Sequence, residues 1–418
     1  MTLFRKIFTV AIAGIFVLLG EAAFGAEELS LQALIEEARE NNPEIQALKK
    51  RYEAADARIW QAGSLADPVF EYEYDTMTPD RELSDNAMQT VGVSQEIPFP
   101  TKLFLRAKIA SQLAKIASQA YQAKEREVFA QVKSAYEELL LIYRSIEITK
   151  ENKGVLNQLS KVATSRYAAN KISQADVLKA QVELAKIESE LIILEQKRLV
   201  AQARLNVLLN RDPGKELGLP AGGGPIRLAR SLDELYALAK DNNPELKAFQ
   251  FGIEKGKAAF RLSQQEFLPD FQVSFRQMIR SSHTEDGMWA GMLGVTIPLW
   301  AHKKVFGVKE MKAELEMLEF EYRMKENMVL FDLQDAYARA EANIKLIELY
   351  ETAFIPQAEQ AFDAAMRGYE AEKTDFLSLL DNQRMLTEFK LGHYKAILGL
   401  RVALADIERV VGKDIDFK

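Results

Sequence analysis

The sequence predicts a mostly helical chain with a membrane β-sheet, built from two copies of one structural unit. Three observations support this prediction. The chain of 418 residues repeats itself at an offset of 201, because Ser30–Ala47 returns as Ser231–Ala248 with an identical Asn-Asn-Pro-Glu in each copy. Each copy continues with two segments in which polar and apolar residues alternate. Each copy ends in two unusually long helical stretches.

The composition is that of an ordinary folded protein. Hydrophobic residues make up 48% and charged residues 28% of the chain, which excludes collagen-like, low-complexity and disordered proteins. The formal net charge is -7, so no basic excess points to a nucleic-acid partner. Cysteine is absent from the sequence, which excludes disulfides, thiolate metal sites and acylation of an N-terminal cysteine.

Residues 1–25 are predicted to form a signal peptide. Arg5 and Lys6 precede the apolar run 7–19, and the segment 23–25 supplies the small residues of a cleavage site. The run is shorter than the roughly 20 residues that a membrane-spanning helix needs. We therefore expect an exported protein, with an uncleaved anchor as the alternative. The stretch 212–230, rich in Gly and Pro, is predicted to link a first repeat at 26–211 to a second repeat at 231–418.

Each repeat contains two predicted strands, about 68–76 and 87–97 in the first and about 269–279 and 288–297 in the second. Large apolar residues occupy alternate positions in these segments, and polar residues occupy the positions between them. Strands of about 9 to 11 residues cross a bilayer when tilted, so we predict that the apolar face contacts lipid. A soluble sheet packed on helices is the alternative. The predicted lipid-facing residues are Phe70, Tyr72, Tyr74, Phe271, Val273, Phe275 and Trp289.

The long helices are predicted at about 103–169 and 173–210, and again at about 305–370 and 374–411. The first of these stretches lacks proline and is rich in strong helix formers. About 65 helical residues would extend about 95 Å, which no compact domain needs. Pro356 is expected to kink the third long helix. Because four strands cannot close a barrel and open sheet edges are not tolerated in lipid, closure requires other chains.

These features resemble the TolC-like family of outer-membrane efflux proteins, the exit ducts of tripartite pumps in Gram-negative bacteria. The resemblance rests on the duplication, the Asn-Pro-Glu opening of each repeat, strand ends that read Gly-Val-Ser-Gln-Glu-Ile-Pro and Gly-Val-Thr-Ile-Pro, and tip patterns that begin Arg166-Tyr167 and Gly368-Tyr369. It implies a homotrimer in which each chain gives four strands to a 12-stranded transmembrane β-barrel above a trimeric α-helical barrel in the periplasm. The family is commonly lipidated at an N-terminal cysteine, so without one the anchoring of this chain in outer-membrane lipid would rest on the strands.

The resemblance also implies a gate at the periplasmic end. Asp176, Tyr369 and Asp381 match the family's gate and aperture positions. Ser378 and Thr374 depart from the second acid and the arginine that the family often has, which puts a double acidic ring and a gate salt bridge in doubt. From the residues alone, Asp381 is equally well explained as part of a solvated face.

Asp176 also has a local explanation. Ser173-Gln-Ala-Asp176 has the pattern of a capping box at the start of a helix, and this role is compatible with a gate contact. The turns between the long helices are candidates for docking a periplasmic adaptor, or are simply solvated turns. Their candidate residues are Asn170, Lys171, Glu372 and Lys373.

The predicted function is an outer-membrane channel that passes substrates delivered by an inner-membrane efflux transporter through a periplasmic adaptor (membrane fusion) protein. The stretch 95–103 looks closest to the heavy-metal-exporting branch of the family, which favours metal cations. A multidrug duct and a periplasmic coiled-coil scaffold without a pore are the alternatives. The three histidines lie far apart in the sequence and no nucleophile with a base is evident, so we predict no enzyme, no cofactor and no resident metal.

Overall fold

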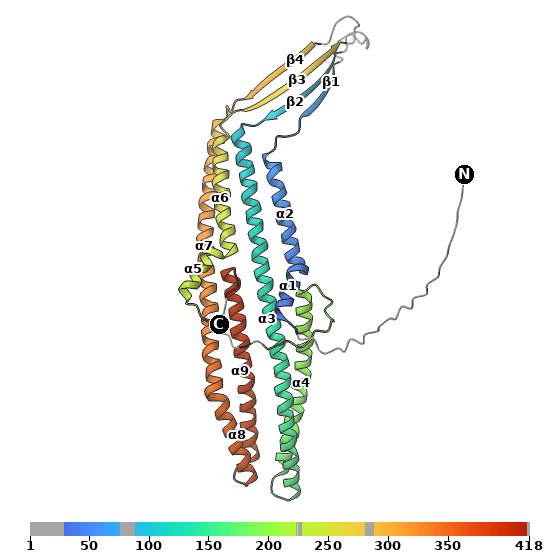
Figure 1. Cartoon of the computed structure of the whole chain (residues 1–418), viewed down its shortest axis with the longest axis vertical. Helices are drawn as coiled ribbons and strands as arrows, with labels where there is room; N and C mark the ends of the chain where they lie inside the picture. Colours follow the sequence, from blue (N-terminus) through green and yellow to red (C-terminus); the bar gives the residue numbers. More distant parts are fainter. Residues whose placement is uncertain (1–28, 76–87, 223, 225–227, 281–287, 416–418) are drawn as a thin grey trace, which may run out of the picture.

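The computed structural model describes residues 29–75, 88–222, 224, 228–280 and 288–415, and Figure 1 shows them as an elongated molecule. A four-stranded sheet occupies one end, and two helical hairpins form the other. The predicted signal peptide lies outside the described residues. No helix in the described ranges has the length and apolar character needed to span a membrane.

The two repeats have the same order of elements. The first contains α1 (Leu31–Asn41), α2 (Pro43–Gly63), β1 (Val69–Asp75), β2 (Met88–Ile97), α3 (Pro100–Ala168) and α4 (Gln174–Leu208). The second contains α5 (Leu232–Asn242), α6 (Pro244–Gln265), β3 (Asp270–Arg280), β4 (Met288–Thr296), α7 (Ala301–Leu349), the π-helical turn η1 (Tyr350–Phe354), α8 (Ile355–Glu370) and α9 (Phe376–Val411).

The repeated Asn-Asn-Pro-Glu separates the two short helices of each repeat and attaches them to a long one. The Asn42 side chain accepts hydrogen bonds from the first turn of α2 and donates one to the Leu208 carbonyl, 2.9 Å away at the end of α4. Asn243 makes the equivalent contacts and donates to the Val410 carbonyl at 2.7 Å. The proline that follows each asparagine starts the next helix, where its missing N–H costs no hydrogen bond. This motif is therefore a structural joint that both copies keep.

The sheet is antiparallel in the order β1-β2-β3-β4. Facing residues across the strands have the same character, because directly paired residues of antiparallel strands point to the same face. Phe70 pairs with Val93, which pairs with Phe275. On the other face Glu71 pairs with Gly92, which pairs with Arg276. The sheet consequently has one apolar and one polar face.

The buried core follows the long helices in three clusters. One lies where α1 packs on α3 and α4, one where α5 packs on α7 and α9, and one near the tips of the two hairpins. Many of its members are alanines with almost no exposed surface, which allows helix axes to approach closely. The core is therefore a narrow seam along each pair of long helices. Such a core suits helices arranged as the wall of a tube and differs from the single central core of a compact domain.

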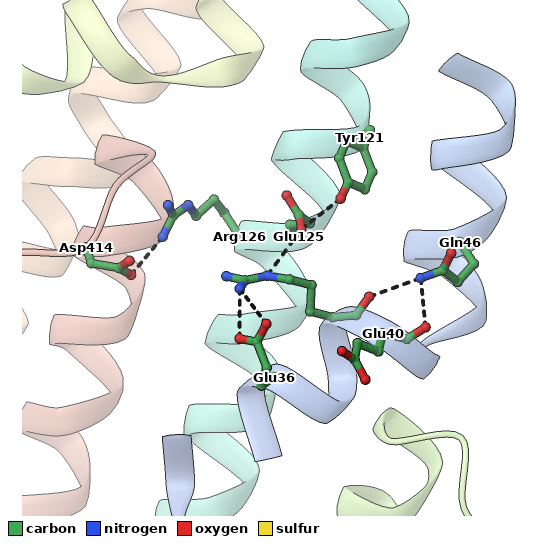
Figure 2. Close-up of polar contacts among 8 residues, drawn as sticks. Glu36, Glu40, Gln46, Tyr121, Glu125, Arg126 and Asp414 are labelled. Atoms are coloured by element: carbon green, nitrogen blue, oxygen red, sulfur yellow. Dashed lines mark hydrogen bonds and ion pairs between the residues drawn. The ribbon is translucent and has the colours of Figure 1, made fainter. Parts of the chain in front are cut away.

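Polar contacts hold the short helices against the long ones near the middle of the molecule (Figure 2). Arg39 of α1 lies 2.7 Å from Glu36 and 3.5 Å from Glu125 of α3, and its guanidinium also covers the Phe129 ring. Arg126 reaches across to Asp414 at 2.7 Å, which ties α3 to the segment after α9. These contacts join the first repeat to the end of the second.

The third long helix is interrupted at η1 rather than at Pro356 itself. Pro356 lies in the first turn of α8, immediately after the π-helical turn that accommodates its missing N–H. The widened turn pushes Tyr350 toward α9, where a Cβ atom at Gly392 would lie only 2.5 Å from the Tyr350 hydroxyl oxygen. Gly392 thus provides the space that the widened turn needs.

Candidate functional site

The two hairpin tips lie side by side at the end of the molecule opposite the sheet (Figure 1). Each tip turn contains one residue with a left-handed backbone, Asn170 with φ 58° and Glu372 with φ 60°. Asparagine adopts this conformation readily, whereas glutamate pays a steric penalty of about 1 kcal/mol. The strained Glu372 is held by Lys171 of the other tip, whose Nζ lies 2.6 Å from its carboxylate. Hydrogen bonding and charge from Lys171 lower the pKa of Glu372.

Arg166 makes the most extensive contact between the tips. Its guanidinium donates to the backbone carbonyls of Tyr369 at 2.6 Å and Glu370 at 2.7 Å. It also lies 4.5 Å from the centre of the Tyr369 ring, within range of a cation-π interaction. Carbonyls at the C-terminal end of α8 carry partial negative charge, so a guanidinium is well placed to bind them.

Tyr369 is buried beneath this arginine. Only 2% of its surface is exposed, and its ring also packs against Phe376. Its hydroxyl has no hydrogen-bond partner among the described residues. Burial raises the pKa of Tyr369, Arg166 opposes that shift and the charge of Asp176 adds to it. The structure therefore brings Asp176 and Tyr369, predicted from different repeats, into one neighbourhood.

The capping box expected at Ser173 does not form. Its hydroxyl donates to the Asp176 carboxylate at 2.9 Å, and its side chain makes no bond to the backbone N–H groups of α4. Asp176 also lies 3.6 Å from Lys179. The Ser173 side chain is turned toward the Asp176 carboxylate and leaves the first backbone N–H groups of α4 without a side-chain cap, so this part of the sequence interpretation is wrong.

Asp381 lies further along α9 and does not join the Asp176–Tyr369 neighbourhood through any described contact. Its side chain is exposed and forms an ion pair of 3.1 Å with Arg384. Arg384 in turn bonds Glu183 of α4, a second tie between the hairpins. Burial acts to raise the pKa of Glu183, but hydrogen bonds from Arg384 and Lys186 outweigh it and lower that pKa.

Sequence reasoning missed Arg166 and Arg384, the two arginines that join the hairpins. In the sequence, Arg166 is recognisable only as the first residue of the Arg166-Tyr167 tip pattern. A basic residue in the last turn of a helix is a recognised signal, but it usually indicates contact with the carbonyls of its own helix. Both arginines instead bind atoms that lie more than 200 positions away.

The residues predicted to face lipid all lie on the apolar face of the sheet. Six of the seven are exposed, with Phe70 at 67% and Trp289 at 62%, and Phe271 is half-buried. Phe275 and Trp289 stack with ring centres 5.0 Å apart. Water does not favour such an array of uncovered aromatic side chains, so this face needs an apolar environment.

Comparisons with known proteins agree with this architecture. The family described as outer membrane efflux protein matches residues 34–211 and 235–413, once for each repeat. The chain is 26% identical to the cobalt-zinc-cadmium resistance protein CzcC of Cupriavidus metallidurans, over 93% of this chain and 91% of that protein.

Solved structures show the same fold. A crystal structure of CusC, described in terms of folding and transmembrane channel formation, aligns with a TM-score of 0.81 at 15% identity, covering 93% of each chain. The outer membrane protein VceC of Vibrio cholerae aligns with a TM-score of 0.79 at 18% identity, covering 92% of this chain and 96% of VceC. The predicted fold class is confirmed. The chain therefore belongs to the outer membrane efflux protein family, and it is an efflux channel of the outer membrane.

Proposed function

We propose that three copies of this chain close into one channel, in which twelve strands form a barrel and the long helices form a tunnel beneath it. The observation that carries this proposal is the open sheet. Strands β1 and β4 each pair on one side only, while the apolar face demands lipid. Unpaired strand edges are too costly in a bilayer, so the edges of neighbouring copies pair and remove them.

The helices beneath the open edges support the same arrangement. Helix α7, which follows β4, exposes a stripe of large apolar side chains below that edge. Helix α2, which precedes β1, exposes Trp60 at 85%. These surfaces continue the two edges downward, and in a closed ring the α7 stripe of one copy lies beside α2 of the next. Members of the stripe are Phe306, Met317, Phe320, Met324 and Phe331.

The sequence supports the remaining assignments. The basic and apolar segments within residues 1–25 act as the export signal, and the strands alone anchor the protein because no cysteine is present for acylation. An inner-membrane transporter supplies the energy, and a periplasmic adaptor docks at the tip turns through Asn170, Lys171, Glu372 and Lys373. All four of these residues are exposed, as docking requires.

Heavy-metal cations are the proposed substrates. The similarity to a cobalt-zinc-cadmium resistance protein over most of both chains favours them over drugs. Cells that lack the gene are expected to lose tolerance to cobalt, zinc or cadmium and to keep tolerance to dyes and detergents. The test is growth over a concentration series, with the restored gene as control. Unchanged metal tolerance together with sensitivity to dyes would favour the multidrug alternative.

Asp381 is proposed to face the aperture at the closed end. Each Asp381 carboxylate makes an exposed ion pair with Arg384, which water and salt weaken. A multivalent cation that three carboxylates around one axis can reach together displaces these contacts and binds there. In planar bilayers, multivalent cations are expected to block the wild-type conductance from the periplasmic side. Asp381→Ala should weaken this block while the trimer persists. Asp176→Ala serves as the comparison and should leave the block unchanged. Equal block in wild type and Asp381→Ala would contradict the proposal of an acidic ring.

A further inference from the structure

An ion pair lies across the polar face of the sheet in a single row of paired residues. Glu71, Gly92, Arg276 and Ala290 stand opposite one another on the four strands. The guanidinium of Arg276 lies 3.1 Å from the carboxylate of Glu71, two strands away. Neighbouring strands are about 4.8 Å apart, so the arginine side chain extends along the sheet rather than away from it.

Gly92 makes this path possible. A Cβ atom at that position would lie 2.9 Å from Cγ of Arg276, closer than side chains approach one another. The glycine in the row therefore lets a long side chain cross the middle of a strand. At the far end, the Ser94 hydroxyl donates to the second oxygen of Glu71 at 3.1 Å. The Glu71 carboxylate is thus held by a hydroxyl as well as by the guanidinium.

Two exposed acidic side chains on this face, Glu73 and Glu96, have no such partner, whereas Asp270 at the base of β3 is paired with Lys102. Glu73 lies one row outward and Glu96 two rows inward on the polar face, and both are exposed. Neither Glu73 nor Glu96 makes an ion pair with a side chain that the structure describes. Arg276 is the basic residue of the Glu71 row, and Arg280 stands at the outer end of β3, opposite Met88. A closely paired cation and anion cancel each other's field at a distance, whereas isolated carboxylates act over about 8 to 10 Å in physiological salt.

We infer that Arg276 tunes the ion selectivity of the channel, by neutralising Glu71 and so removing one negative charge per chain from the wall that passing ions meet. The inference rests on the proposed function, in which the polar face lines the lumen. With its counter-ion in place, Glu71 contributes little to attraction of cations. Without it, the same carboxylate adds one negative charge per chain to the wall.

Two single substitutions should therefore shift selectivity in opposite directions. Arg276→Gln leaves Glu71 unpaired and should move the reversal potential in a KCl gradient toward the potassium equilibrium value. Glu71→Gln leaves Arg276 unpaired and should move it toward the chloride value. The double variant removes both charges and should return close to wild type. Arg276→Lys keeps the positive charge on the wall and should shift the reversal potential less than Arg276→Gln.

The matched control is the ion pair between Glu36 and Arg39 on α1, far from the sheet, where Glu36→Gln and Arg39→Gln should leave selectivity unchanged. If the wild type conducts and all the sheet variants have the same reversal potential as the wild type, the inference about Arg276 is wrong while the proposed channel stands. Shifts of equal sign for the two single variants would contradict the inference as well. A wild-type protein that forms trimers without conductance would overturn the proposed channel and this inference with it.

Discussion

Replacing Tyr72 with lysine is expected to keep much of the protein out of the outer membrane. Tyr72 is exposed on the apolar face near the middle of β1, and a lysine at the midplane of a membrane barrel costs about 2 to 4 kcal/mol per chain. Three copies would multiply that cost in one barrel. The measurement is the amount of trimer recovered from washed outer membranes, compared with wild type expressed equally.

Glu73→Lys is the matched control, because it introduces the same residue one position along on the opposite face. Its side chain would point to the polar face, so insertion should continue at near the wild-type level. Equal recovery of the two variants would contradict a barrel with its aromatic face in lipid. Equal loss of both would show that β1 tolerates no lysine at all and would contradict the assignment of faces.

Arg166→Ala is expected to loosen the contact between the hairpin tips and, if the tips form the gate proposed above, to raise the single-channel conductance. The change removes two charge-assisted hydrogen bonds and a ring contact between the hairpins. Hydrogen bonds of this kind contribute about 1.5 to 3 kcal/mol each when they are buried. Because Arg166 is only half-buried, we expect its contacts to stabilise the joined tips by about 2 kcal/mol per chain in total. Planar-bilayer recordings of purified trimers would measure the increase directly.

The comparison variants separate this contact from the charge of the tip. Arg367→Ala removes a nearby exposed arginine that makes no described side-chain contact, and it should leave conductance unchanged. Lys171→Ala breaks an ion pair that is exposed to water and screened by it, so it should raise the conductance less than Arg166→Ala. Arg166→Lys retains the charge without the two-pronged geometry, so its conductance should lie between those of the wild type and Arg166→Ala. An unaltered conductance in Arg166→Ala would remove this residue from the gate.

The fold class could be predicted because its signals are local or repeated. Alternation along β1 and β3, the proline-free length of α3 and the recurrence of one motif in both copies are each visible in a short window of sequence. The π-helical turn before Pro356 was less accessible. Proline signals that a helix is disturbed, but whether it bends or widens depends on the space that Gly392 of another helix provides.

The candidate site was only partly predictable for a different reason. Asp176 and Tyr369 came from family positions, and the structure places them near one another. Arg166 and Arg384 bind groups contributed by the other repeat, and no periodicity within a helix records such a contact. The Ser173 motif failed because two side chains that could each bind the backbone bound one another instead.

The ties between the tips also record how far the two copies of the repeat have diverged. Near the tips, equivalent positions lie 202 apart, because Asn170 and Glu372 are the left-handed residues of the two turns and Ser173 and Asp375 precede α4 and α9. Lys171 thus pairs with the counterpart of Asn170, and Glu183 pairs with Arg384, the counterpart of Val182. Two identical first repeats would offer an uncharged asparagine and valine at these places, and neither ion pair would form. The charged ties between the hairpins therefore depend on the divergence of the copies, and a ring of identical single repeats would lack them.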